Sequence, residues 1–356
     1  MIVVTKPGLL ASVQDLGRHG HRQRGICPGG ALDALAMALA NRLVGNAEDA
    51  AGLELTMGGC TLRFDTATRI ALAGGDFGAR LDGVPLFPNW SVPVAAGQML
   101  TLSGAAANDR SLRTWLAVAG GIDVPSVLGS RSTDLKAAFG GHQGRALKKG
   151  DRLPLGATAL DAAQLARRPF GLRGPEWDID NSNRDTGSLF GAGSDAEDFG
   201  DAIPLRVMPG PEFHQFTPEA QVAWFSAPWR ITPQSNRMGS RLEAVDKGLS
   251  LQRVNKVDML SSGVIPGTVQ VPPSGQPIIL MGDAQTTGGY PRIGVVIRAD
   301  LWKLAQAPLG GQLRMVRVDT TAALAAWEAQ QRYLAQVLQG LKAAGWPITE
   351  GATHAD

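Results

Sequence analysis

Short apolar runs separated by glycine-containing turns recur along most of this chain, and they limit its possible folds more than any other feature. A first set covers residues 53–56, 61–64, 69–73, 91–94 and 99–102, and a second covers residues 205–208, 268–271, 278–281, 293–297 and 312–318. These runs are too short for helices, and the turns between them draw on 45 glycines and 22 prolines. Short strands at this close spacing predict a mainly β protein built from barrels or sandwiches.

Helical periodicity is confined to a few stretches. In residues 31–43 the apolar side chains recur at helical spacing, and Gly45 and Asn46 follow where a C-terminal cap belongs. A second apolar stripe, carried by Leu324, Trp327 and Leu334, predicts a helix after Val318. Residues 8–20, rich in glycine and polar groups, predict a loop.

The two sets of strands resemble each other weakly, which favours a duplicated domain. Residues 70–76 end in Gly-Gly-Asp76 and residues 278–283 end in Gly-Asp283, although such a pattern also arises by chance in a glycine-rich chain. Residues 158–203 contain small and polar residues typical of a linker or mobile insert. We therefore expect a first domain at residues 1–157, a second at 204–318, and a C-terminal helix and tail at 319–356.

Charge and chain composition exclude several classes of partner. Lysine and arginine number 34 against 32 aspartates and glutamates, giving a net charge of +2 without a long basic run, so nucleic acid is not an expected partner. No stretch approaches the ~18 apolar residues of a membrane span, and the N-terminus lacks the apolar core of a signal peptide. We expect a cytoplasmic protein that does not bind a membrane.

The sequence carries no recognisable metal, nucleotide or biotin motif. Cys27 and Cys60 lack zinc-site spacing, and His19 and His21 lack a third ligand nearby, so no metal site is assigned. A GxxxxGK[ST] phosphate loop, a GxSxG elbow, an HExxH motif and a biotin-attachment Met-Lys-Met are all missing. If ATP or biotin takes part in the reaction, another chain should supply at least part of the machinery.

The richest chemistry lies in a polar loop between the runs at 278–281 and 293–297. Its functional groups belong to Asp283, Gln285, Thr286, Thr287, Tyr290 and Arg292, with Gly288 and Gly289 among them. A carboxylate, an amide, hydroxyls and a guanidinium on one glycine-containing loop can bind a small polar molecule. A long hairpin turn that satisfies its own backbone explains the composition equally well.

Several residues outside this loop are further candidates. Arg237, in residues 234–241, suits a carboxylate or phosphate, although an arginine that pins a loop is equally common. Arg145 ends a glycine-rich segment with His142 that could hold an anion, or could be a solvated basic loop. Asp76 is supported only by the repeat. Asp15 and Arg18 could serve a site or form a structural pin.

Several ordered motifs resemble the biotin-dependent carboxyltransferase-like family. They are Ser12-Val-Gln-Asp-Leu-Gly-Arg18, Gly29-Gly-Ala-Leu-Asp33, Gly45-Asn46, Gly129-Ser-Arg-Ser-Thr133, Gly140-Gly-His-Gln-Gly-Arg145, Ser235-Asn-Arg-Met-Gly239 and residues 282–294. The resemblance covers most of residues 2–318. It implies two tandem cyclophilin-like β-barrel domains with a few covering helices.

Members of that family include the C subunit of 5-oxoprolinase, the carboxyltransferase domain of urea carboxylase, and an antagonist of a sporulation-kinase inhibitor. The resemblance implies an ATP-dependent hydrolase that opens the lactam of 5-oxoproline to glutamate, assembled with 5-oxoprolinase subunits A and B. ATP is not expected to bind this chain alone. The alternatives are a carboxyltransferase that uses carboxybiotin to act on urea or a related amide, and a regulator that binds a kinase-inhibitor-like B protein.

The same resemblance implies roles for the candidate residues. Asp283 would orient or deprotonate, and Gln285, Thr286 and Thr287 would bind the lactam or ureido edge of the substrate. Tyr290 and Arg292 would line the site, with Tyr290 as a wall. Arg237 and Arg145 would hold anionic groups. Asp76, supported only by the internal repeat and not by the resemblance, is a weaker candidate.

Overall fold

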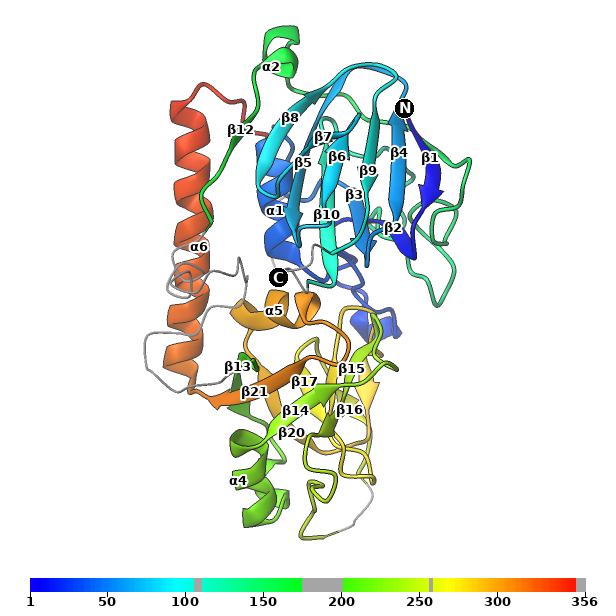
Figure 1. Ribbon diagram of the computed structural model, residues 1–356. Coiled ribbons are helices and arrows are strands. Elements are labelled where there is room, and N and C mark those ends of the chain that lie inside the picture. Colours follow the sequence, from blue (N-terminus) through cyan, green and yellow to red (C-terminus); the bar gives the residue numbers. More distant parts are fainter. Residues whose placement is uncertain (106–110, 175–200, 256–258, 350–356) are drawn as a thin grey trace. The chain divides into compact units, whose positions relative to one another are not determined.

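The computed structural model describes residues 1–105, 111–174, 201–255 and 259–349 (Figure 1). The chain divides into two compact units: Met1–His19, Gly29–Leu189 and Arg332–Asp356 form the first, and Gly20–Pro28 and Phe190–Gln331 form the second. Residues 20–28 thus belong to the second unit, and the C-terminal residues from Arg332 belong to the first. Within the expected linker, residues 175–200 lie outside the described residues.

The first unit contains two six-stranded sheets (Figure 1). Its strands are β1 (Ile2–Pro7), β2 (Leu10–Gln14), β3 (Gly52–Thr56), β4 (Cys60–Phe64), β5 (Thr68–Gly74), β6 (Ala79–Leu81), β7 (Val84–Pro85), β8 (Trp90–Val94), β9 (Met99–Leu102), β10 (Arg113–Val118), β11 (Arg152–Leu153) and β12 (Phe170–Gly171). The sheet orders are β11-β1-β4-β9-β6-β7 and β12-β8-β5-β10-β3-β2. One apolar core, which includes Ile2, Leu53, Phe64 and Leu116, draws residues from both sheets.

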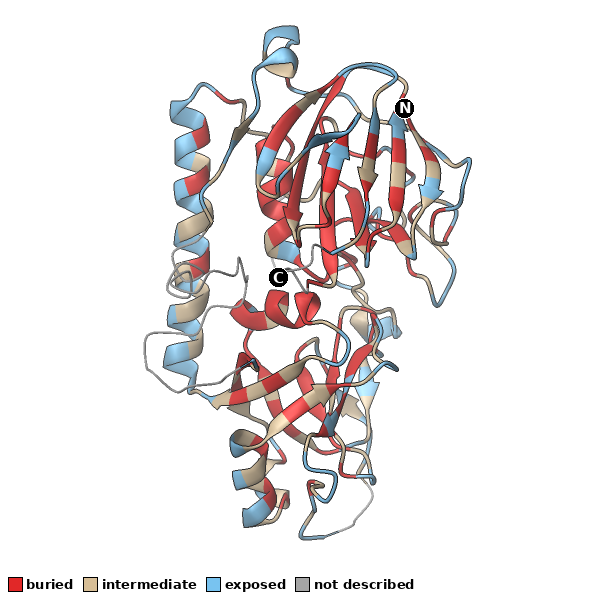
Figure 2. Ribbon diagram, viewed as in Figure 1, coloured by how far each residue is buried: buried red, intermediate tan, exposed pale blue. Residues whose placement is uncertain are grey.

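Strands β5 and β10 are buried on both faces. Ile70 and Leu72 belong to the core between the sheets, whereas Ala71 and Ala73 face a second core that contains helix α1 (Ala34–Leu43). Burial on both faces explains why these strands read as continuous apolar runs instead of alternating ones. Figure 2 shows buried residues along most of these strands and of α1. The alanines leave room for α1, which begins after Asp33, whose carboxylate accepts a hydrogen bond from the Ala36 amide.

The second unit is a closed barrel, with a separate two-stranded sheet beside it. Its strands are β13 (Ile203–Pro209), β14 (Pro228–Ile231), β15 (Gly239–Ala244), β16 (Ser262–Gly263), β17 (Thr268–Gln270), β18 (Ile278–Leu280), β19 (Thr287–Gly288), β20 (Arg292–Val296) and β21 (Gln312–Arg317). The barrel order is β13-β20-β17-β18-β15-β14-β21, and β16 pairs with β19. The parallel pairing of β13 with β21 closes the barrel, while its other pairs are antiparallel.

The remaining described helices are short except for the last. They are α2 (Ala162–Ala166), α4 (Pro218–Ser226), α5 (Leu301–Gln306) and α6 (Thr320–Ala343), with 3-10 turns η1 (Arg22–Arg24), η2 (Phe213–Gln215) and η3 (Arg298–Asp300). Helix α6 belongs to the second unit up to Gln331 and to the first from Arg332. Among the described residues, no helix combines the length and apolar character needed to cross a bilayer.

The mainly β prediction is confirmed, since both predicted sets of runs form strands, and the two stretches with helical periodicity form helices. The predicted loop at residues 8–20 is wrong in part, because residues 10–14 form β2, paired with β3. Ser12 and Gln14 are polar yet buried, so this strand lacks the apolar alternation that would reveal it. Strands β14 and β15 and helices α4 and α5 were also not predicted from the sequence.

Candidate functional site

The polar loop after β18 folds back as half of a small two-stranded ribbon. Ser262 pairs with Gly288 and Gly263 with Thr287, and the Val264 amide donates to the Thr286 carbonyl at 3.0 Å. We call residues 260–265 and 285–290 the site ribbon. Its side chains at Gln285, Thr287 and Tyr290 are exposed, and Thr286 is partly buried. The loop therefore satisfies its own backbone, as a hairpin does, and still presents polar side chains to solvent.

Asp283 and Arg237 form a buried, two-point ion pair at the base of this loop. The guanidinium donates from Nε to Oδ2 and from Nη2 to Oδ1, both at 2.9 Å. The side chains are only 6% and 5% exposed for Arg237 and Asp283 respectively. Strand pairing explains this contact. Gly239 of β15 lies opposite Leu280 of β18, so Arg237 and Asp283, which lie just beyond these two residues, meet at the same end of the barrel.

Arg292, at the start of β20, forms a second fork with Glu212. Glu212 follows β13, the antiparallel neighbour of β20, and accepts from Nη2 at 2.6 Å, Nε at 2.7 Å and the Arg292 amide at 3.0 Å. The hydrogen bond from Arg292 lowers the pKa of Glu212, and the same bond raises the pKa of Arg292. The remaining guanidinium nitrogen, Nη1, donates to the Gly263 carbonyl in the site ribbon at 3.2 Å.

Two further side chains contact the backbone of the site ribbon. Gln270, 2% exposed on β17, donates from Nε2 to the Tyr290 carbonyl at 3.3 Å. Arg22 of η1 donates to the Val264 carbonyl. Sequence reasoning did not identify Glu212, Gln270 or Arg22, because the contacts that implicate them join positions far apart in the chain.

Arg145 and Asp76 belong to the first unit, whereas the site ribbon belongs to the second. The Arg145 guanidinium donates two hydrogen bonds to the Asp151 carboxylate, at 2.7 and 2.9 Å. These bonds, together with a backbone hydrogen bond from Lys148 and the charge of His142, lower the pKa of Asp151 to about 2. The Asp76 carboxylate accepts from the Gly78 amide at 2.8 Å, as in an Asx turn. Both side chains therefore take part in local loop structure.

Asp15 anchors the segment at residues 130–132 through hydrogen bonds. Its carboxylate accepts hydrogen bonds from the hydroxyls of Ser130 and Ser132 and from the Arg131 amide. Arg18 is fully buried, donates to the Ser132 carbonyl and stacks on Phe139 with its Cζ 4.5 Å from the ring centroid. These contacts support the structural interpretation of the Asp15 and Arg18 pair.

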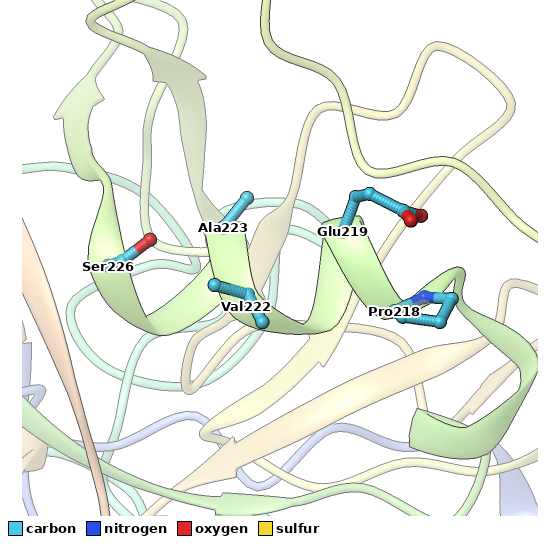
Figure 3. A pocket seen from close by; sticks show the side chains of 5 residues that line it. All are labelled: Pro218, Glu219, Val222, Ala223 and Ser226. Carbon is cyan, nitrogen blue, oxygen red and sulfur yellow. The ribbon is translucent and has the colours of Figure 1, made fainter.

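A surface pocket lies along α4 in the second unit. It is lined by Pro218, Glu219, Val222, Ala223 and Ser226, whose side chains follow the exposed side of the helix (Figure 3). None of the candidate residues lines it. Across the part of the chain that the structure describes, no three histidine, cysteine, aspartate or glutamate side chains are grouped to hold a metal ion.

Comparison with known proteins gives matches over nearly the whole chain. The family model described as "Carboxyltransferase domain, subdomain A and B" matches residues 24–317. The C subunit of 5-oxoprolinase from Escherichia coli (strain K12) is 44% identical over 337 residues, which cover 95% of this chain and 97% of that protein. The C subunit of 5-oxoprolinase from Haemophilus influenzae is 36% identical, covering 92% of this chain and 94% of that protein.

A solved structure shares the fold. The crystal structure of Kluyveromyces lactis urea carboxylase superposes with a TM-score of 0.80 at 28% identity, covering 94% of this chain but only 29% of that longer chain. The carboxyltransferase-like fold expected from the sequence motifs is thereby confirmed. The family model and the two bacterial relatives establish that the chain belongs to the carboxyltransferase domain family, subdomains A and B.

Proposed function

We propose that this chain is the C subunit of an ATP-dependent 5-oxoprolinase, which opens 5-oxoproline to L-glutamate together with subunits A and B in the cytoplasm. The observation that carries the proposal is the 44% identity to the Escherichia coli C subunit over 97% of that protein. Yeast urea amidolyase from Lachancea kluyveri is less similar, at 32% identity, and the match covers only 17% of its length. Lactam opening is therefore favoured over urea carboxylation.

The chemistry requires activation of a poorly electrophilic amide. Resonance stabilises the lactam of 5-oxoproline. Transfer of the terminal phosphoryl group of ATP to the lactam oxygen, with release of ADP, makes the lactam carbon electrophilic. Addition of water and cleavage of the C–N bond then give an acyl phosphate, and a second water releases phosphate and leaves glutamate, which explains the coupling to ATP. The contribution of this chain is to bind and orient the lactam. Gln285, Thr286 and Thr287 offer donors and acceptors for its amide edge, and the half-exposed Tyr290, at 46%, forms a wall beside them.

Of the two roles that the resemblance implies for Asp283, orienting and deprotonating, its contacts favour orienting. Both of its carboxylate oxygens accept hydrogen bonds from Arg237. A base must reach the proton that it abstracts, and this carboxylate is turned toward a guanidinium in a buried fork. Asp283 and Arg237 therefore orient the loop that carries the substrate-binding residues.

The test is reconstitution of activity with purified subunits. Glutamate formation from 5-oxoproline and ATP is measured with this chain and subunits A and B, omitting each in turn. We expect strict dependence on this chain. Gln285→Ala and Thr287→Val should each lower kcat/KM by about tenfold, because each removes a hydrogen bond to the substrate.

Gln336→Ala is the matched control, since Gln336 is an exposed glutamine on α6 outside the site ribbon. Its activity should equal that of the unmodified chain. Full glutamate formation without this chain would refute the proposed function. Unchanged kcat/KM in a Gln285→Ala/Thr287→Val double variant would show that the site ribbon does not bind the substrate.

A further inference from the structure

The site ribbon is joined to the barrel by side chains whose role in the reaction is unassigned. Two strands of two residues each, β16 and β19, form this small sheet. Isolated two-stranded sheets are marginally stable in water, so its geometry depends on external contacts. Arg22 donates to the Val264 carbonyl, and Val264 packs against Leu280 and Ala284. Further polar contacts come from Glu212, acting through Arg292, and from Gln270.

Glu212 anchors the β16 strand indirectly. It is 8% exposed, and its two oxygens hold Arg292 through the amide, Nε and Nη2. Forked, charge-assisted hydrogen bonds fix the plane of a guanidinium as well as its position. With that plane fixed, Nη1 of Arg292 points at the Gly263 carbonyl of the ribbon, 3.2 Å away.

Gln270 anchors the opposite strand directly. Its buried amide donates to the Tyr290 carbonyl at 3.3 Å. Gly288 packs against the same amide, so closely that a Cβ there would lie 2.3 Å from Gln270 Nε2. The half of the ribbon that carries Thr287 and Tyr290 therefore rests on the Gln270 side chain, which would have to shift to admit a larger residue at position 288.

We propose that Glu212 and Gln270 are positioning residues that hold the two strands of the site ribbon on the barrel, so that Gln285, Thr287 and Tyr290 meet the lactam in a fixed geometry. The kinetic part of this inference rests on the proposed function. Displacement of binding groups by about 1 Å can lower a rate by about 100-fold, which gives remote anchors a measurable effect.

The experiment compares Glu212→Gln and Gln270→Met with Glu243→Gln, a control in the exposed ion pair between Arg230 and Glu243 of the same barrel. Amide hydrogen exchange is measured in peptides that cover residues 259–265 and 285–290, with barrel strands β13 and β21 as the internal reference. The kcat/KM for 5-oxoproline is measured in the complex with subunits A and B.

We expect exchange in the site ribbon to become about tenfold faster or more in both anchor variants and to stay unchanged in the reference strands and in the control. The kcat/KM should fall by about 100-fold without loss of complex formation. A purely structural role for Glu212 would lower the unfolding temperature and leave kcat/KM unchanged.

Two results separate this inference from the proposed function. Unchanged ribbon exchange in both anchor variants, with normal exchange in the reference strands, overturns the positioning role whatever the activity. A wild-type complex that makes no glutamate refutes the proposed function, while faster ribbon exchange in the variants would still support the anchors. If Glu212→Gln fails to fold, the Gln270→Met and Arg292→Lys variants test the positioning role instead. Lysine at position 292 cannot form the two-point contact with Glu212 that arginine forms.

Discussion

Arg237 and Asp283 lie directly beside an exposed polar loop, and both side chains are almost completely removed from solvent. A buried ion pair holds geometry well, because each partner would carry a large desolvation cost without the other. The same reasoning applies to Glu212 and Arg292, whose side chains are 10% and 19% exposed respectively. At the level of single residues, these four charged side chains form ion pairs with one another and orient the backbone beside the site ribbon.

Asp283→Ala removes the carboxylate from beside the buried Arg237 guanidinium. We expect a decrease in the free energy of unfolding of about 3–5 kcal/mol, measured by urea denaturation. The apolar double variant Arg237→Met/Asp283→Leu should recover most of that loss, because it buries no charge. Glu243→Ala, in an exposed pair of the same barrel, should change stability by less than about 1 kcal/mol. Equal effects at Asp283 and Glu243 would contradict this account.

Asp151 provides a prediction about acid sensitivity. The fork from Arg145 is the main reason that the pKa of Asp151 falls to about 2 in the folded protein, against ~3.9 in an unfolded chain. A depressed carboxyl pKa contributes stability above the unfolded value and loses it as the pH falls toward the folded value. Between pH ~4 and ~2, Asp151→Asn should therefore show a weaker loss of stability than wild type in urea midpoints. Parallel pH curves for the two proteins would argue against the pair.

Helix α2 shows how one buried side chain can organise a whole element. The helix has only five residues and would not be stable alone. Arg69 of β5, fully buried, donates to the carbonyls of Gln164, Leu165, Arg167 and Arg168 at the end of the helix, and its guanidinium lies against the rings of Phe170 and Trp346. Burial, and then the nearby charge of Arg167, lowers the pKa of Arg69 to about 10, so it remains cationic at neutral pH.

Arg69→Met should release the segment around α2 from the sheet. Methionine fills much of the volume but donates no hydrogen bonds to the carbonyls at the end of α2. We expect trypsin to cut after Arg167 about tenfold faster, read from the masses of the fragments, whereas the bond from Arg168 to Pro169 resists trypsin in either protein. Arg63→Met is the control, because Arg63 is 45% exposed on β4 and pairs with Asp65. Cleavage after Arg167 that stays as slow in Arg69→Met as in wild type would rule out this anchoring role.

At the scale of the whole molecule, the C-terminal segment returns to the first unit and completes its core. Val337, Leu341 and Trp346 belong to the same apolar core as α1 and the alanines of β5. The Trp346 ring packs edge-on against Phe170 at 4.9 Å between centroids. Residues far apart in the sequence therefore share one core, which the simple order of two consecutive domains does not provide.

Trp346→Ala tests that contribution to the core. Trp346 is 3% exposed, and loss of a buried tryptophan side chain should cost about 3–5 kcal/mol in the unfolding of the first unit. Trp90→Ala is the control, since Trp90 is 42% exposed on β8. The midpoints of urea denaturation, followed by circular dichroism, compare the two variants. A smaller effect at Trp346 than at Trp90 would exclude the C-terminal segment from the core.

Much of the architecture was predictable because its signals are local. Strands such as β5 and β18 are recognisable as apolar runs ended by glycine, and the polar loop between β18 and β20 stood out by composition. The roles of the predicted site residues remain predictions. The structure places Arg237 beside the polar loop, in contact with Asp283. Strand β2 was missed because its polar side chains are buried by neighbours that the local sequence does not specify.

The sequence by itself determined the strand-rich fold, the position of the polar loop and the family motifs, since each depends on residues close together in the chain. Tertiary structure alone decided which charges meet. Glu212 reaches Arg292 across 80 residues, and Arg237 reaches Asp283 across 46. These pairs follow from strand register in a closed barrel, which is set by the packing of the whole sheet and leaves no local trace at either residue.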